Sequence, residues 1–393
     1  MEGEINNFIK VWLSILVCLS YCYAISKIVS KGLSRLLCVL PIVCLFIFLP
    51  LDLHSIHLRS TTAFFIVWLA NFKLLLFAFG RGPLCFDPWI SLGRFVALAC
   101  LPIKIQQNTP PKKINPSPLK SHLDGHNKEN LPPKPIEKPK NPPMPHLNGQ
   151  NKENPTSKKT QERHISPLNY AIKGILFSIL TRLYDYSDYM HPKVIMLLYF
   201  LHTYFLLEFI LAIATTLARA LLGIELEPQF NEPYLTSSLH DFWGGRWNLM
   251  VTNILCLSVY NLTCHTMTCV VGHRWAQLFA VFATFMVSGL MHELMFYYMG
   301  LIKPSWEVTW FFLLNGLCLV VEVVMKEVVL AGRFQLPWLI SGPLTIGFVI
   351  ITSFWLFFPP FLWFKDDEKA FEEYVALGEF LKNVILTFIR VHT

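Results

Sequence analysis

The stretch WAQLFAVFATFMVSGLMHELMFYY, residues 275–298, decides the fold class of this chain. It is almost entirely apolar over a length that suffices for a helix to cross the hydrocarbon core of a bilayer, for which about 20 residues are needed. The sequence therefore predicts an all-α polytopic membrane protein, a bundle of about eight or nine transmembrane helices. Other apolar blocks occupy residues 8–25, 36–51, 62–79, 194–222, 306–330 and 339–358, with weaker ones at 171–183 and 249–262.

The composition also disfavours a soluble enzyme. Of 393 residues, 53% are hydrophobic and 15% are charged, whereas a soluble protein has about 45–50% apolar and about 25% charged residues. The ten cysteines lie mostly in apolar blocks and show no CxxC spacing. Neither a disulfide framework nor a zinc site is indicated, and we expect no bound metal.

The positive charge is concentrated in one segment, residues 104–164. It holds 12 basic and 5 acidic residues, a difference that equals the net charge of +7, and 12 of the 26 prolines. We expect a disordered Pro/Lys-rich loop, because such a composition buries too little apolar surface to fold, and a cytosolic one, because basic loops favour that side. It divides the chain into a transmembrane region at 1–103, the insertion at 104–164 and a second membrane region at 165–393. The apolar residues 91–103 are too few for a span and fit an interfacial or re-entrant piece.

His292 and Glu293 are ionisable residues inside the apolar stretch at residues 275–298. Such residues are costly in an apolar span and are therefore functional candidates, and imidazole is the base that most easily stays uncharged. A histidine satisfied by a neighbouring helix is the structural alternative. HELMF resembles the start of a HExxH zinc site, but Phe296 stands where the second histidine belongs, so a zinc protease is excluded. Glu208 and Arg219 share another span, where pairing between helices is at least as well supported as a role in transport.

The segment PQFNEPYLTSSLHDFWGGRWNLM, residues 228–250, is polar and aromatic although it lies between two apolar blocks. It combines tryptophans suited to a membrane interface with a carboxylate, a fixed cation and an amide. Two interpretations remain open: an interfacial anchor, or the polar half of a site completed by His292. The residues concerned are Asp241, Trp243, Arg246, Trp247 and Asn248.

Together these motifs, with His292 placed 44 residues after Asn248, resemble the plant wax synthase branch of the membrane-bound O-acyltransferase (MBOAT) superfamily. The similarity covers nearly the whole chain outside 104–164. It extends to FIKVW at 8–12, LFIFLPL at 45–51, VWLANFKLLLFAFG at 67–80 and PSWEVT at 304–309.

The resemblance implies an MBOAT-like helical bundle in the endoplasmic reticulum membrane. It also implies an enzyme that transfers a fatty acyl group from acyl-CoA to a lipid hydroxyl, with residues 165–393 as the catalytic region. The expected acceptor is a long-chain alcohol, which gives a wax ester. A sterol or diacylglycerol acceptor and a non-catalytic lipid-binding relative are the alternatives. Acyl-CoA is a co-substrate, so no separate cofactor is expected, nor is nucleic acid a partner.

The resemblance also assigns roles. His292 corresponds to the family's catalytic histidine and Asn248 to its polar partner. We expect His292 to act as general base on the acceptor hydroxyl and then to protonate the departing thiolate. Asn248 is expected either to hold the acceptor or to stabilise the oxyanion.

Arg246 is the expected contact for acyl-CoA, because an arginine can hold phosphate in bidentate fashion. Asp241, Trp243, Arg246 and Trp247 are expected to support the active-site loop. In one place the chain departs from the branch, which usually reads FWGRRW: Gly245 stands where an arginine is usual. A transporter is a competing class, but it predicts internal repeats of topology that are not found.

The first testable prediction concerns the insertion. Replacing residues 110–160 with a short Gly/Ser linker should leave turnover per molecule within about threefold, because a segment of this composition does not form part of a packed site. Acyl transfer by membranes with equal amounts of the two proteins measures this. A hundredfold loss at equal expression would show that the segment folds or binds something essential.

Overall fold

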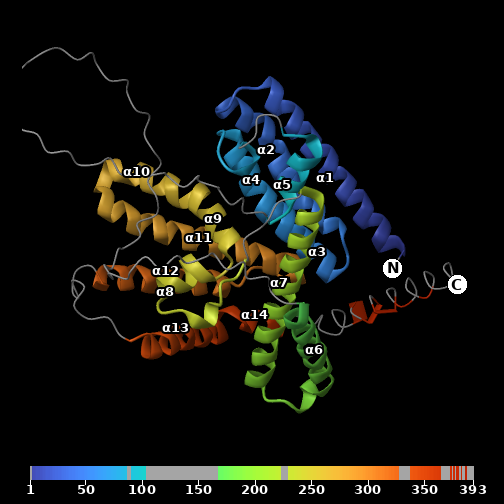
Figure 1. The fold of residues 1–393 in the computed structure, drawn as a ribbon, viewed down its shortest axis with the longest axis vertical. Helices are drawn as coiled ribbons and strands as arrows, with labels where there is room; N and C mark the ends of the chain where they lie inside the picture. Colours follow the sequence, from blue (N-terminus) through green and yellow to red (C-terminus); the bar gives the residue numbers. More distant parts are fainter. Residues whose placement is uncertain are drawn as a thin grey trace, which may run out of the picture. The chain divides into compact units, whose positions relative to one another are not determined.

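The computed structural model describes residues 2–85, 90–102, 167–222, 229–326, 337–363 and a few positions between 372 and 386. These residues are helical, and eight helices among them are long and apolar enough to cross a membrane, which confirms the predicted fold class (Figure 1). The predicted insertion at 104–164 lies outside the described residues. The longer helices are α1 (Glu2–Ile28), α2 (Leu33–Phe48), α3 (Ile56–Ala63), α4 (Asn71–Ala78), α6 (Pro167–Leu183), α7 (Pro192–Leu222), α9 (Leu249–Leu255), α10 (Asn261–Val271), α11 (His273–Gly300), α12 (Glu307–Val324) and α13 (Trp338–Thr352).

Several spans are built from consecutive helices joined by π-helical turns. The turn Phe64–Ala70 joins α3 to α4, and the turn Cys256–Tyr260 joins α9 to α10, so the weak block at 249–262 becomes a full span, Leu249–Val271. The short block at 91–103 forms α5 (Leu92–Cys100), which is not among the eight spanning candidates. It therefore does not cross as a span of its own, as its length predicted.

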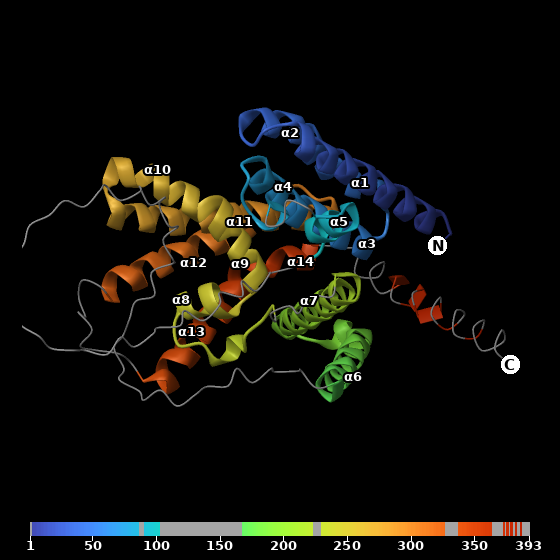
Figure 2. The same cartoon turned by 45° about the horizontal axis from the view of Figure 1, so that its top comes forward.

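The N-terminal and C-terminal membrane regions share one core. Buried side chains of α1, α2, the α3–α4 span and α5 pack together with residues near the end of α11, among them the almost fully buried Tyr298. The α11 helix also lies beside α10 and α12, while α6 and α7 form a hairpin (Figure 2) in which α7 also contacts α5. Residues 275–298, which predicted the fold class, thus also lie at the centre of the helix packing.

Buried cations satisfy the carboxyl ends of helices. Lys73 is fully buried, and its Nζ donates to the carbonyls of Leu98 and Leu101, at 2.9 and 2.6 Å, where α5 ends. Arg59 is buried in the same way and donates to the carbonyl of Met299, at 3.0 Å, at the end of α11. The last carbonyls of a helix have no partner within the helix and carry partial negative charge, so each cation is compensated locally.

Carboxylates satisfy the amino ends. Outside the spans, Glu373 accepts hydrogen bonds from the backbone N–H groups of Ile56 and His57, at 2.7 and 3.1 Å, and from the Ser55 hydroxyl at 2.9 Å, where α3 begins. Burial raises the pKa of the Glu373 carboxyl, but hydrogen bonds from His57, Ile56 and Ser55 outweigh burial and bring it to about 2. The contact is therefore complete above the ordinary carboxylate pKa and is lost only as pH falls toward 2.

Close packing of α11 on α12 depends on two glycines. A Cβ at Gly316 of α12 would lie 2.7 Å from the Cβ of Phe285, and a Cβ at Gly289 of α11 would lie 3.2 Å from both the Cβ of Phe312 and the Cα of Thr309. Small residues let membrane helices approach closely, which strengthens their van der Waals contact. This approach places Phe312 of α12 directly beside the α11 residues that follow Gly289.

Gly316→Ala should therefore destabilise the protein by about 1–3 kcal/mol, because the added methyl group meets the rigid base of a side chain and forces the helices apart. Thermal unfolding of the detergent-solubilised protein measures the effect. Gly347→Ala in α13 is the matched control, since nothing lies within 4 Å of the added Cβ and alanine is the better helix former. Equal melting temperatures for the two variants would contradict this account of the helix contact.

Candidate active site around His292

His292 lies on α11 with its ring half-buried. Its Nδ1 lies 2.7 Å from the backbone carbonyl oxygen of Ser288, one helical turn earlier. Because a carbonyl oxygen only accepts hydrogen bonds, the proton of a neutral ring sits on Nδ1 and the lone pair sits on Nε2. The backbone of α11 thus fixes the tautomer in which Nε2 can take up a proton.

Aromatic rings from three other elements enclose the His292 ring. Phe312 of α12 stacks on it with ring centroids 4.2 Å apart and an interplanar angle of 29°. Trp68, from the π-helical turn after α3, meets it edge to face at 4.7 Å and 84°. Phe357, from the π-helical turn Ser353–Phe357 after α13, lies 6.0 Å away. Such surroundings favour the neutral imidazole, because a cation there would be poorly solvated.

Glu293 has a structural task on another face of the same helix. It is 5% exposed and accepts hydrogen bonds from the backbone N–H groups of Trp306 and Thr309, at 2.7 and 3.3 Å. These groups lie at the start of α12, where unpaired N–H groups and the helix dipole favour a carboxylate. The two neighbours in HELMF therefore have different surroundings. The His292 ring lies among aromatic rings, whereas Glu293 accepts hydrogen bonds from the start of α12, the helix that carries Phe312.

Trp243 brings the polar segment at 228–250 to His292. It lies in the π-helical turn Phe242–Arg246, and its indole nitrogen donates to the Oδ1 of the fully buried Asn315, at 3.3 Å. Its ring lies 5.9 Å from Phe312, which stacks on His292. Trp247 packs on the same cluster, 6.4 Å from Trp243. The two motifs singled out in the sequence therefore meet in space, through Phe312.

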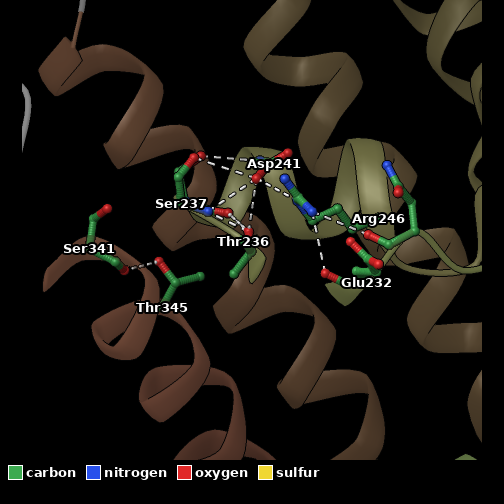
Figure 3. Close-up of polar contacts among 9 residues, drawn as sticks. Glu232, Thr236, Ser237, Asp241, Arg246, Ser341 and Thr345 are labelled. Carbon is green, nitrogen blue, oxygen red and sulfur yellow. Dashed lines mark hydrogen bonds and ion pairs between the residues drawn. The ribbon is translucent and has the colours of Figure 1, made fainter. Parts of the chain in front are cut away.

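Asp241 and Arg246 brace this polar segment (Figure 3). The Nε of Arg246 donates to the Oδ2 of Asp241 at 2.7 Å, and Asp241 also accepts from the backbone N–H of Ser237 at 3.0 Å. The Nη1 of Arg246 donates to the carbonyl oxygens of Asn231 and Glu232, both at 3.3 Å. Two nitrogens of the guanidinium thus form hydrogen bonds within the loop.

The α13 helix covers the same segment. A Cβ at Gly342 would lie 2.8 Å from the carbonyl oxygen of Thr236, and Ser341 and Thr345 on α13 face the Thr236–Ser237 end of the loop (Figure 3). At Gly245 itself φ is not positive, and a Cβ there would meet only the Oδ1 of Asp241, at 3.4 Å. A larger residue is therefore compatible with the backbone at this position.

Asn248 begins α9 in the left-handed conformation, with φ of 40° and ψ of 64°, and its side-chain oxygen accepts from the backbone N–H of Val251 at 3.4 Å. No hydrogen bond between Asn248 and His292 is present among the described contacts. The helix it starts packs in one cluster with Trp68 and Met291. The structure therefore places Asn248 next to elements of the site, and its amide nitrogen has no hydrogen-bond partner among the described residues.

Glu208, the other acidic residue noted in an apolar span, pairs with Lys173 between α7 and α6. Interhelical pairing thus accounts for it. Sequence reasoning missed Trp68 and Phe312 as neighbours of His292. Trp68 lies in the matched stretch VWLANFKLLLFAFG, but nothing in its spacing points to His292.

Comparison with known proteins agrees with this arrangement. The membrane bound O-acyl transferase family matches residues 226–314, the part of the chain that holds the polar segment and His292. An acyl-CoA–sterol O-acyltransferase 1 of Arabidopsis thaliana is 42% identical over 96% of this chain and 97% of its own length. A long-chain-alcohol O-fatty-acyltransferase of Simmondsia chinensis is 38% identical over 98% of both chains.

A probable long-chain-alcohol O-fatty-acyltransferase 3 of Arabidopsis thaliana is 39% identical over 91% of both chains. Similarity at this level over nearly the full length extends to all the elements that surround His292. The chain belongs to the membrane bound O-acyl transferase family and is an acyltransferase.

Proposed function

We propose that this enzyme transfers a fatty acyl group from acyl-CoA to the hydroxyl of a membrane lipid alcohol, with His292 as general base. The observation that carries the proposal is the hydrogen bond from Nδ1 of His292 to the Ser288 carbonyl. It leaves a basic Nε2 in an aromatic, partly exposed position inside a membrane span. That combination suits removal of a proton from a lipid hydroxyl, since the base must remain neutral and accessible.

In this mechanism Nε2 accepts the hydroxyl proton while the oxygen attacks the thioester carbonyl carbon. The electron pair of the C=O double bond moves to the carbonyl oxygen. It then returns as the C–S bond breaks, and the imidazolium gives its proton to the CoA thiolate. General base catalysis contributes about 10² to 10⁴ in rate. No separate cofactor is required, because the thioester is already activated.

We assign Asn248 to the same step, as a ligand of the acceptor hydroxyl or of the developing oxyanion. Its position at the start of α9 supports this, because α9 packs against Trp68 and Met291, which flank His292. One donor to an oxyanion is worth about 3–4 kcal/mol in transition-state stabilisation.

The CoA moiety is polar and must reach the site from water, whereas the acyl chain and the acceptor dissolve in lipid. Trp243 and Phe312 form a chain of ring contacts between the polar loop and His292. We propose that CoA approaches along the loop that Arg246 and Asp241 brace. We also propose that this end faces the cytosol, in the endoplasmic reticulum membrane.

A long-chain alcohol is the proposed acceptor, which makes the product a wax ester; relatives named for this activity are 38% and 39% identical to the chain. A sterol is the second candidate, favoured by 42% identity to a sterol acyltransferase. Membranes that contain the protein would be incubated with labelled acyl-CoA and equal amounts of fatty alcohol, sterol and diacylglycerol. A wax ester as main product supports the first candidate, a sterol ester replaces it with the second, and absence of any ester overturns the proposed activity.

His292→Ala should abolish ester formation while the protein stays in the membrane and still binds acyl-CoA, because removing a base lowers kcat without removing the binding surface. Asn248→Ala should cost about 10²-fold or more, and the double variant should be little worse than His292→Ala if the two residues act as a unit. Turnover and acyl-CoA binding by the purified variants measure this.

His202→Ala is the matched control. This histidine also lies in an apolar span, on α7, but it packs against Phe177 of α6, with ring centroids 5.2 Å apart, in a different cluster. His202→Ala should therefore lower turnover only slightly. If His292→Ala retains a tenth of wild-type turnover, the histidine is structural and the mechanism is wrong.

Gly245→Arg should lower the KM for acyl-CoA a fewfold, because it adds a fixed cation beside Arg246 at a position where the backbone accepts a side chain. Steady-state kinetics with varied acyl-CoA measure this. Gly244→Arg is the control, since it places the same charge at the exposed neighbouring residue, where nothing lies within 4 Å. Loss of activity in Gly245→Arg alone would show that the loop requires glycine at this position.

A further inference from the structure

The indole nitrogen of Trp68 is a buried donor that lacks a hydrogen-bond acceptor among the described residues. The side chain is only 3% exposed. An indole N–H can only donate, and a buried donor without an acceptor is destabilising, so such groups in a native structure call for an explanation. The ring that carries this donor meets His292 edge to face.

The local backbone supports a functional reading of this position. Trp68 lies in the π-helical turn Phe64–Ala70, and π-helical turns are rare and often occur at functional sites. On the same span, Asn71 and Lys73 have polar groups paired with backbone carbonyls. Among the described residues of this span, the amide of Asn71 and the ammonium of Lys73 therefore have acceptors, whereas the Trp68 indole nitrogen and the Ser60 hydroxyl have no hydrogen-bond partner.

We propose that the Trp68 indole N–H donates a hydrogen bond to the thioester carbonyl oxygen during acyl transfer. The inference rests on the proposed role of His292. In the reacting complex the hydroxyl oxygen of the lipid alcohol lies within hydrogen-bond reach of Nε2 of His292. Once this oxygen has attacked, it and the thioester carbonyl oxygen are bound to the same tetrahedral carbon. His292 and Trp68, whose rings are in contact, can therefore bind the hydroxyl oxygen and the carbonyl oxygen at the same time.

The donor takes part without gaining or losing a proton. As the hydroxyl oxygen bonds to the carbonyl carbon, the C=O electron pair moves to the carbonyl oxygen, and the N–H hydrogen bond strengthens with that negative charge. When the C–S bond breaks, the charge leaves with sulfur and the hydrogen bond weakens again. A donor fixed by packing, in surroundings that exclude water, stabilises the transition state more than the substrate.

The test replaces Trp68 by Phe and, in a second variant, by benzothienylalanine, which keeps the shape of indole but has sulfur in place of N–H. We expect kcat to fall about 10²-fold in both, as for loss of one oxyanion donor, with the KM for acyl-CoA within about twofold. Binding of an unreactive thioether analogue of acyl-CoA, which lacks the carbonyl oxygen, should be unchanged. A merely structural role would weaken the analogue's binding together with kcat.

Trp12→Phe is the matched control, because the Trp12 indole nitrogen is likewise buried without a described acceptor but lies on α1, outside the rings around His292. It should keep wild-type kcat. His292→Ala is assayed in parallel. If His292→Ala is inactive and the benzothienylalanine variant keeps a third or more of wild-type kcat, the role of Trp68 is refuted and the proposed function stands. If His292→Ala is active, the proposed function itself fails.

Discussion

Helix ends that are buried away from water leave backbone N–H and C=O groups that an apolar interior cannot satisfy, and three buried polar side chains of this protein satisfy such groups. Lys73 and Arg59 cover the carboxyl ends of α5 and α11, and Glu293 covers the amino end of α12. Each charge is stabilised by a helix end, and each helix end by a charge. Neither partner is tolerable alone in a low-dielectric interior.

The site depends on this compensation. Arg59 and Glu293 act near the carboxyl end of α11, the first on the helix itself and the second on the start of α12. Between them they fix two helices whose facing side chains are His292 and Phe312. The position of His292 therefore depends on the hydrogen bonds that Arg59 and Glu293 form with helix ends.

Much of this could be predicted from the sequence. Hydropathy located the spans, because apolar length alone decides whether a helix crosses a bilayer, and it also showed that residues 91–103 are too short. The cost of an ionisable residue in a span singled out His292. The polar segment was recognisable because Asp241, Arg246 and Asn248 stand between apolar blocks.

The contacts that each site residue makes could not be predicted from the sequence. His292 and Glu293 are adjacent in sequence but about 100° apart around the helix, and nothing in HELMF says which of them meets a helix end. Trp68 lies 224 residues before His292, and contact between distant helices leaves no periodicity in either one. Arg246 was predicted both to support the loop and to contact acyl-CoA, but its partners in the loop, Asp241 and the carbonyl of Asn231, leave no signal in the sequence.

Three rings of the site lie in π-helical turns: Trp68, Trp243 and Phe357. A π-helical turn holds one residue more than an α-helical turn, so deletion of a single residue there turns every following side chain by about 100° and shortens the span hardly at all. Gain or loss of one residue in such a turn would therefore change which side chains surround His292.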